Sequence, residues 1–157
     1  SDSTELAGDV EKVICKFIEY SKVETIARLG LRYVNDVSYK ELEGKDWTKL
    51  FPSSLLGAIN FASEHSKKYA RAMGQLVFKE TDADITFNFG VWNSDYPNAA
   101  LRPNFVLDID CYSRLPFEAN IKQLVETVKS YNGHAEKLFE ASVTDDLRDM
   151  LNTDNRE

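Results

Sequence analysis

One stretch of the sequence, Ala27 to Val37, alternates apolar and polar residues over most of its length and constrains the fold more than any other. Successive side chains of an extended strand point to opposite faces, so Leu29, Leu31 and Tyr33 share one face. The other face carries Arg28, Gly30, Arg32 and Val34. Its two arginines flank Gly30, which has no side chain and so allows another group to approach the backbone closely. The pattern predicts a half-buried β-strand, which we expect in the middle of a sheet.

Three later segments show the same two-residue period and are predicted to be the remaining strands, at residues 75–80, 84–92 and 104–112. Few residues separate the first two of these segments, which favours a hairpin. The segment Asn93 to Pro103, by contrast, contains two prolines and two asparagines. It is predicted to be a long connection, and such connections often carry binding groups.

Two segments near the ends of the sequence repeat apolar residues at steps of three and four, as amphipathic helices do. The first is Asp2 to Tyr20. The second begins after Pro116 and runs through Phe139, and a helix of about 25 residues would be about 37 Å long, longer than any strand here. It must therefore cross the sheet. Thr144 is then predicted to cap a short terminal helix with the apolar residues Leu147, Met150 and Leu151.

The segment between the first two strands is less regular. Trp47, Leu50 and Phe51 precede Pro52 and predict a short helical turn that closes one edge of the core. Ser53 or Ser54 can cap a helix whose apolar residues are Leu55, Leu56, Ile59 and Phe61. We also expect a helix at residues 64–73, with the dense basic cluster Lys67, Lys68 and Arg71 on its solvent-exposed face.

Together these elements predict an α+β fold. A four-stranded antiparallel sheet would be packed on one face by the N-terminal helix and the long C-terminal helix, followed by a short terminal helix. Residues 1–152 would form a single domain, and residues 153–157 a frayed tail. Because a helix abuts the first residues, we expect the chain to be the C-terminal part of a longer protein.

The formal net charge is −7, from 26 acidic and 19 basic residues. That balance makes binding to nucleic acid or to an anionic membrane unfavourable unless basic residues gather locally. Apolar runs are only a few residues long, against roughly 20 needed to cross a bilayer, so no membrane partner is expected. Cys15 and Cys111 cannot form a disulfide framework and are interpreted as buried or half-buried thiols, which predicts a cytoplasmic protein.

Five blocks of the sequence occur in a characteristic order: RLGLRYVN at residues 28–35, DW with SLLG at 46–57, GQLVF at 74–78, VLDID at 106–110 and HAEKLFEASVTDDLRDML at 134–151. Taken together they resemble a sporadically distributed prokaryotic family of uncharacterised proteins. The resemblance spans most of the chain and implies that it is the C-terminal part of a longer protein. It brings no established activity or catalytic residue, and such a scattered distribution is typical of accessory or defence-associated genes.

Two acidic residues on the last predicted strand form the clearest candidate site. Asp108 and Asp110 lie two residues apart, so their carboxylates project from one face about 7 Å apart. Such a pair could hold Mg²⁺ or Mn²⁺ for phosphoryl transfer. It could instead pair with Arg28 and Arg32 of the first strand, which would make the two strands neighbours. We favour the ion pairs over the metal site.

Aromatic and basic residues form a second candidate site near the outward face and the long connection, namely Trp92, Tyr96, Tyr112, Arg102 and Arg114. Such residues often dominate contacts with proteins or ligands. His65 and His134 lack metal-type partners at helical spacing, and no nucleophile or phosphate-loop pattern occurs in the sequence. We therefore predict no catalytic residue, no metal and no cofactor.

Three functions stay open on these grounds. The first is a non-enzymatic protein-interaction or assembly module that binds a partner protein or a second copy of itself, because the edges of an open sheet can template pairing. The second is a metal-dependent phosphoesterase or nuclease that uses Asp108 and Asp110. The third is a small-molecule sensor with a cavity beneath the long helix, under Val128 and Tyr131.

Overall fold

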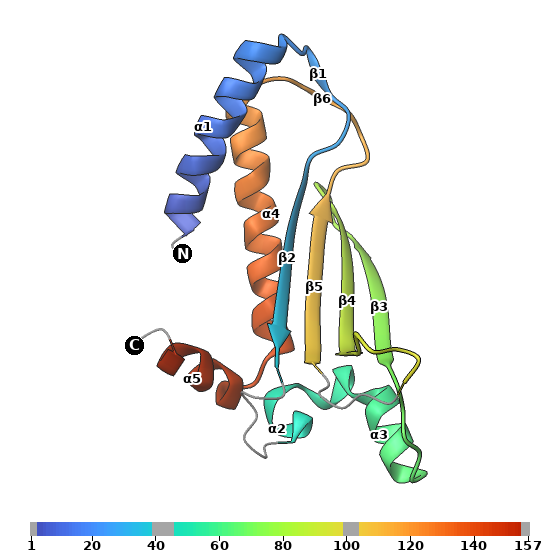
Figure 1. Cartoon of the computed structure of the whole chain (residues 1–157). Helices are drawn as coiled ribbons and strands as arrows, with labels where there is room; N and C mark the ends of the chain where they lie inside the picture. Colours follow the sequence, from blue (N-terminus) through green and yellow to red (C-terminus); the bar gives the residue numbers. More distant parts are fainter. Residues whose placement is uncertain (1–2, 39–45, 99–103, 155–157) are drawn as a thin grey trace.

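The chain folds around a four-stranded antiparallel sheet with the strand order β2-β5-β4-β3 (Figure 1). The computed structural model describes residues 3–38, 46–98 and 104–154. The strands of this sheet are β2 Gly30–Val37, β3 Ala72–Lys79, β4 Asp84–Trp92 and β5 Asn104–Tyr112. The long helix α4, Ile121–Ser142, packs against β5 and β2, so the predicted α+β fold is confirmed.

β2 lies at an edge of the sheet, so the expectation that the strand near position 30 is central was wrong. β5 pairs with β2 on one side and with β4 on the other, and Asp110 is opposite Arg32 and Thr86. The prediction that the strand carrying Arg32 and the strand carrying Asp108 and Asp110 are neighbours is confirmed. The alternation identifies the buried face of β2, but an edge strand alternates in the same way as a central one, so the pattern carries no information on strand order.

The N-terminal helix α1, Ser3–Ser21, packs on α4 and lies beside its first half (Figure 1). Among the described residues α4, rather than the sheet, is its main packing partner. Because α4 already covers the inner face of β5 and β2, α1 forms a further layer outside it. Val13, Phe17 and Tyr20 of α1 consequently stay exposed.

A short ribbon precedes α4, in which β1 Thr25–Ile26 pairs with β6 Phe117–Glu118. Helix α4 begins only at Ile121, where Asn120 caps it by accepting the Gln123 N–H at 3.1 Å. The prediction that the long helix begins directly after Pro116 is therefore wrong at its start, since Phe117 belongs to the ribbon. A pairing of two residues is too short to show a periodicity in the sequence.

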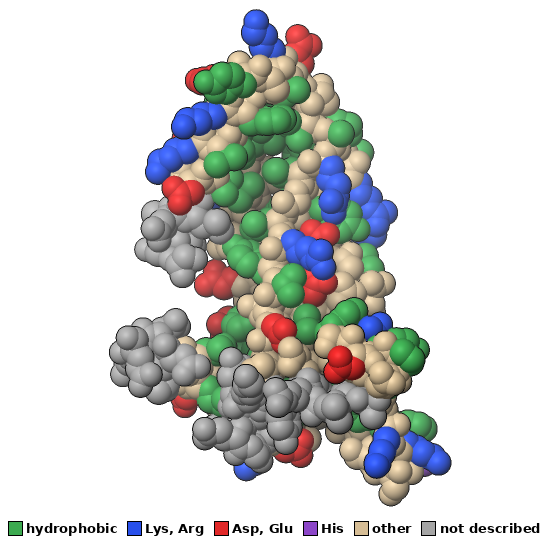
Figure 2. Space-filling view, viewed as in Figure 1, with side chains coloured by type: hydrophobic (Ala, Val, Ile, Leu, Met, Phe, Trp, Pro, Cys, Tyr) green, Lys and Arg blue, Asp and Glu red, His purple; other side chains and the backbone are tan. Residues whose placement is uncertain are grey.

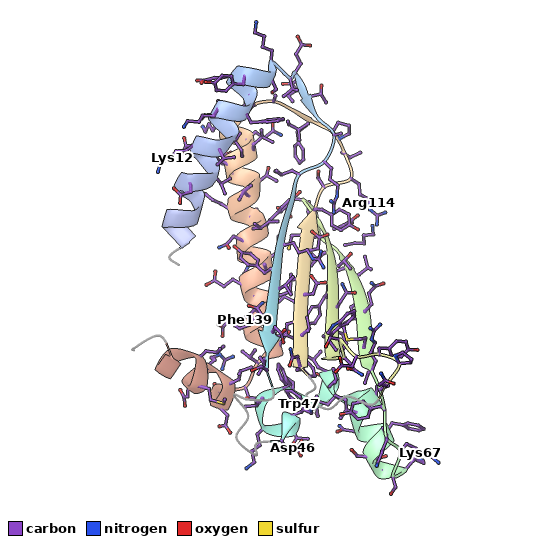
Figure 3. The ribbon with its side chains drawn as sticks, viewed as in Figure 1. Lys12, Asp46, Trp47, Lys67, Arg114 and Phe139 are labelled. Atoms are coloured by element: carbon purple, nitrogen blue, oxygen red, sulfur yellow. The ribbon has the colours of Figure 1, made fainter. Side chains whose placement is uncertain are left out.

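Short helices close the lower end of the sheet, namely α2 Trp47–Leu50, the 3-10 helix η2 Ser53–Leu55 and α3 Gly57–Glu64. Trp47 packs against Phe51 and Phe105, with ring centroids 6.1 and 5.6 Å apart, and lies below the strands in Figure 3. The predicted closure of the core edge is confirmed. The helix expected over residues 64–73 does not form, because α3 ends at Glu64 and β3 begins at Ala72. The polar residues between them offer no apolar stripe that would hold a helix on the core.

The hydrophobic core lies between the inner face of the sheet, α4 and the short helices. Tyr131 of α4 is fully buried there, and its hydroxyl donates to the Asp82 carbonyl oxygen at 3.4 Å. Helix α5, Asp145–Asp154, follows as predicted, and the Thr144 hydroxyl before it donates to the Lys49 carbonyl oxygen at 2.6 Å. The end of the tail expected at residues 153–157 lies outside the described residues. Within the described ranges, no helix has the length and apolar character needed to cross a membrane.

Candidate functional site

The two faces of the sheet differ, because α4 covers the inner face and the described helices leave the outer face largely open. The outer face carries the polar side of each predicted alternation. It also carries exposed apolar side chains, namely Val34, Met73, Val77 and Trp92. Figure 2 shows basic and acidic side chains next to one another over β2 and β5. Most of the binding residues proposed from the sequence lie on this face.

A polar network crosses all four strands of the outer face. The Arg32 guanidinium donates to both carboxylate oxygens of Asp108, at 2.7 and 2.9 Å. Asn88 Nδ2 donates a hydrogen bond to the same carboxylate at 3.0 Å. Asn88 Oδ1 in turn accepts a hydrogen bond from Gln75 Nε2 at 2.7 Å. The hydrogen bonds from Arg32 and Asn88 outweigh burial and lower the pKa of the Asp108 carboxyl. The Asp108 side chain therefore stays charged and engaged at neutral pH.

A second ion pair lies beside this network. Arg28 Nη2 donates to Asp110 Oδ2 at 3.1 Å, and its guanidinium lies over the Tyr112 ring, 4.6 Å from the centroid. The predicted pairing of the two arginines with the two aspartates is thus confirmed. In the parts of the chain that the structure describes, no group of three or more His, Cys, Asp or Glu side chains could hold a metal ion. These contacts favour structural ion pairs over a metal site on β5.

The aromatic residues of the second candidate site fall into two separate groups. Arg71, just before β3, lies over the Trp92 ring at 4.0 Å and the Tyr96 ring at 4.8 Å. Tyr112 lies at the opposite end of the sheet, opposite Asp84 in the register, and so does not join Trp92. Arg114 also pairs with Asp84 at that end (Figure 3). Arg102 lies outside the described residues.

Arg71 belongs to the same group of side chains as Trp92 and Tyr96, but the sequence analysis did not place it there. The sequence predicts Arg71 on a solvent-exposed helix face, but that helix does not form. Had Arg71 been assigned to the strand, the hairpin register would have placed it beside Trp92, since Ala72 is opposite Val91. The incorrect prediction of a helix over residues 64–73 therefore hid the contact between Arg71 and Trp92.

A groove of about 640 Å³, here called the outer groove, crosses the outer face from β2 to β3. It is lined by the polar network, by Arg71 and Trp92, and by the apolar side chains of Val34, Met73 and Val106. Gly90 of β4 lies between Val106 and Met73 in the register, so no side chain divides the groove at this point. Its φ is +130°, and a Cβ there would lie 2.1 Å from the Ala72 carbonyl oxygen, so only glycine fits.

A cluster of Asp82, Ser130 and His134 lies away from the outer face. The Ser130 hydroxyl donates to one Asp82 carboxylate oxygen at 2.5 Å, and His134 Nε2 lies 2.9 Å from the other. The Ser130 hydrogen bond is the main cause that lowers the pKa of Asp82. Because the carboxylate stands between serine and imidazole, the imidazole is not placed to activate the hydroxyl as a general base would. The cluster instead fixes the β3–β4 hairpin to α4.

Comparison with known proteins gives no information on the site. No family model, no curated protein and no solved structure matches the chain. What the outer face does has to be inferred from its own geometry and charge.

Proposed function

We propose that this chain is a non-enzymatic protein-interaction module that binds its partner through the outer face of the sheet. The observation that carries this proposal is a strand-lined groove of about 640 Å³ on a face that the described helices leave open. Its lining combines apolar side chains, amides and a stacked Arg71–Trp92 pair, and tryptophan and arginine are enriched at the centres of protein interfaces.

The charged residues of this face support binding over catalysis. Both oxygens of Asp108 accept hydrogen bonds from Arg32, and Asp110 accepts one from Arg28. A metal-dependent phosphoesterase would need these carboxylates to turn toward a cation. The ion pairs would have to break first, so this alternative has less support.

The space beneath α4 gives little support to a small-molecule sensor. Tyr131 is fully buried there and Val128 is 6% exposed, so side chains pack closely at the position where we expected a cavity. The outer groove is open to solvent along the sheet and suits an extended protein segment better than an enclosed small ligand.

The remaining expectations also belong to this proposal. A cytoplasmic location, a prokaryotic origin and an accessory or defence-associated role come from the sequence alone. Membership of the sporadically distributed prokaryotic family stays a prediction as well. A partner protein and a second copy of the chain are both compatible with the module.

Site-specific photo-crosslinking tests the proposed function. Benzoylphenylalanine is placed at Val34 or at Met73 on the outer face, and the chain is irradiated inside cells that produce it. Both positions are exposed side chains that line the groove, so the analogue fits without repacking. We expect a discrete adduct from both positions, identified by mass spectrometry as a partner protein or as a second copy.

Exposed positions on α4 provide the matched controls. The same analogue at Glu126 or Glu136 should give no discrete adduct, because these side chains face solvent on the helix. Adducts of equal yield from the α4 positions, or none from Val34 and Met73, would contradict the proposed function.

A further inference from the structure

β3 forms the edge of the sheet on the side away from β2, and among the described residues it pairs only with β4. The Glu80 N–H donates to the Ala83 carbonyl oxygen at 2.8 Å, next to the hairpin turn. Hydrogen-bonded and non-hydrogen-bonded pairs alternate along an antiparallel ladder. The main-chain groups of Met73, Gln75 and Val77 are therefore directed away from β4. Such a row of main-chain groups is a template for a further strand.

Hollows lie on both sides of β3 near its beginning. The outer groove reaches Met73 and Gly74 from one side. On the other side a hollow of about 200 Å³, here called the inner hollow, lies between β3 and the residues around the start of α3 and is lined in part by Leu55 and Phe89. The Phe89 ring lies across Gly74, only 2.6 Å from where a Cβ would be, so a side chain at position 74 would displace it.

These two hollows match the geometry of an added strand. Side chains of a strand point alternately to the two faces of a sheet. A segment paired with β3 would direct one set of side chains into the outer groove and the other toward the inner hollow. Exposed Leu76 and Val77, one on each face, would continue an apolar surface beside it.

The charge along β3 indicates what kind of segment fits. Lys79 at the end of β3 is paired with Asp84 at 2.8 Å. Arg71 at the beginning is stacked over Trp92 and Tyr96, and no described carboxylate pairs with it. β3 contains no Asp or Glu, so a second copy of β3 paired antiparallel would bring Lys79 rather than a carboxylate beside Arg71, and self-pairing is disfavoured. A carboxylate of a partner segment would complement Arg71.

We propose that β3 binds an extended peptide segment of a partner protein as a fifth strand, with a carboxylate of that segment on Arg71. The inference rests on the proposed function and names the chemistry of the partner. The segment has about six residues, the length of an average strand, with apolar side chains in alternate positions. The carboxylate is either an acidic side chain or the C-terminus of the segment.

Hydrogen exchange provides a direct test. The chain is used to select from random peptides displayed on phage, and the selected sequence is synthesised as the probe. Exchange of backbone amides is then followed by NMR with and without the peptide. We expect the amides of Met73, Gln75 and Val77 to become protected, whereas those of Gly74 and Leu76, already in the ladder with β4, change little. Protection without this alternation would overturn the proposal.

Three variants separate main-chain pairing from side-chain contact. Val77→Pro removes an N–H that points away from β4, so it should weaken peptide binding by tenfold or more while β3 still pairs with β4. Val77→Thr keeps the N–H and the branched shape, so it should bind as the native chain does. Arg71→Ala should weaken binding by about tenfold and remove the preference for acidic peptides. Amidation of the peptide C-terminus and Glu→Gln replacement within it distinguish the two sources of the carboxylate.

The possible outcomes separate this inference from the proposed function. Equal binding by Val77→Pro and Val77→Thr would overturn strand addition, and so would the absence of any selected peptide. Photo-crosslinks from the outer face would in either case still support a protein-binding module. If Val77→Pro does not fold, as judged by circular dichroism, the exchange pattern of the native chain and Arg71→Ala decide the question.

Discussion

The Asp108 carboxylate shows how a single residue joins the strands of the outer face. It accepts hydrogen bonds from Arg32 and Asn88, and these lower its pKa. A carboxyl whose pKa is lower in the folded state stabilises the fold above its unfolded-state pKa of about 3.9. That contribution is lost as the pH falls through the lower pKa of the folded state.

Asp108→Asn should therefore lower the free energy of unfolding by about 1 kcal/mol at pH 7, a modest effect because the Arg32 side chain is 60% exposed to solvent. The difference from the native chain should shrink as the pH falls below about 4. Urea denaturation at several pH values measures it, with Glu126→Gln on the exposed side of α4 as the control. A difference that grows on acidification would contradict the role of the ion pair.

The two cysteines should differ in reactivity. Cys111 is fully buried on β5, and burial raises the pKa of its thiol to about 11, so little thiolate forms at neutral pH. Cys15 on α1 is half-buried. Iodoacetamide at pH 8 should modify Cys15 in the folded protein and Cys111 only in denaturant, as mass spectrometry of the intact chain would show. Rapid modification of Cys111 in folded Cys15→Ser would show that the core opens there.

At the scale of elements, two glycines should respond oppositely to the same substitution. Gly90→Ala places a Cβ against the Ala72 carbonyl oxygen at a φ of +130°, and should cost about 1–3 kcal/mol or more. Gly133 lies in α4 with no atom within 4 Å of an added Cβ, so Gly133→Ala should stabilise the chain by about 1 kcal/mol. Thermal denaturation of both variants measures the effects. A stabilising Gly90→Ala would contradict the positive φ at Gly90 and its close approach to Ala72.

The cluster of Asp82, Ser130 and His134 joins the β3–β4 hairpin to α4. The Ser130 hydroxyl joins α4 to Asp82, so Ser130→Ala should lower the free energy of unfolding by about 1 kcal/mol. The hydroxyl of Thr127 donates only within α4, to the Gln123 carbonyl oxygen at 2.9 Å, and Thr127→Ala is the matched control. Equal losses in the two variants would show that the contact between hairpin and helix adds nothing.

Sequence patterns predicted which face of each element is buried, but they predicted less well which elements lie next to one another. The period of two in β4 and β5 and the apolar stripe of α4 identified their buried sides, because burial leaves a local imprint on composition. The edge position of β2, the β1–β6 ribbon and the pairing of Arg71 with Trp92 depend on which strands meet, and no local pattern records this. The Arg32–Asp108 pair could be predicted because both residues lay on predicted outward faces.

At the scale of the whole molecule, the described elements are unevenly bound to the core. β4 and β5 lie in the middle of the sheet, whereas α1 packs mainly on α4 and exposes Phe17 and Tyr20. We therefore expect α1 to open at a lower free energy than β5. Hydrogen exchange followed by mass spectrometry should show α1 exchanging first in native buffer. Equal protection of both elements would indicate that the chain opens only as one unit.

The two tryptophans lie in different environments, so their intrinsic fluorescence can report on the core and on the outer groove separately. Trp47 is buried below the strands and is 8% exposed, whereas Trp92 lines the outer groove and is 44% exposed. Acrylamide should quench the fluorescence of Trp92 and spare that of Trp47 until the core melts. In a Trp47→Phe chain the tryptophan emission would come from Trp92 alone, so that occupancy of the groove can be followed in real time without an attached dye.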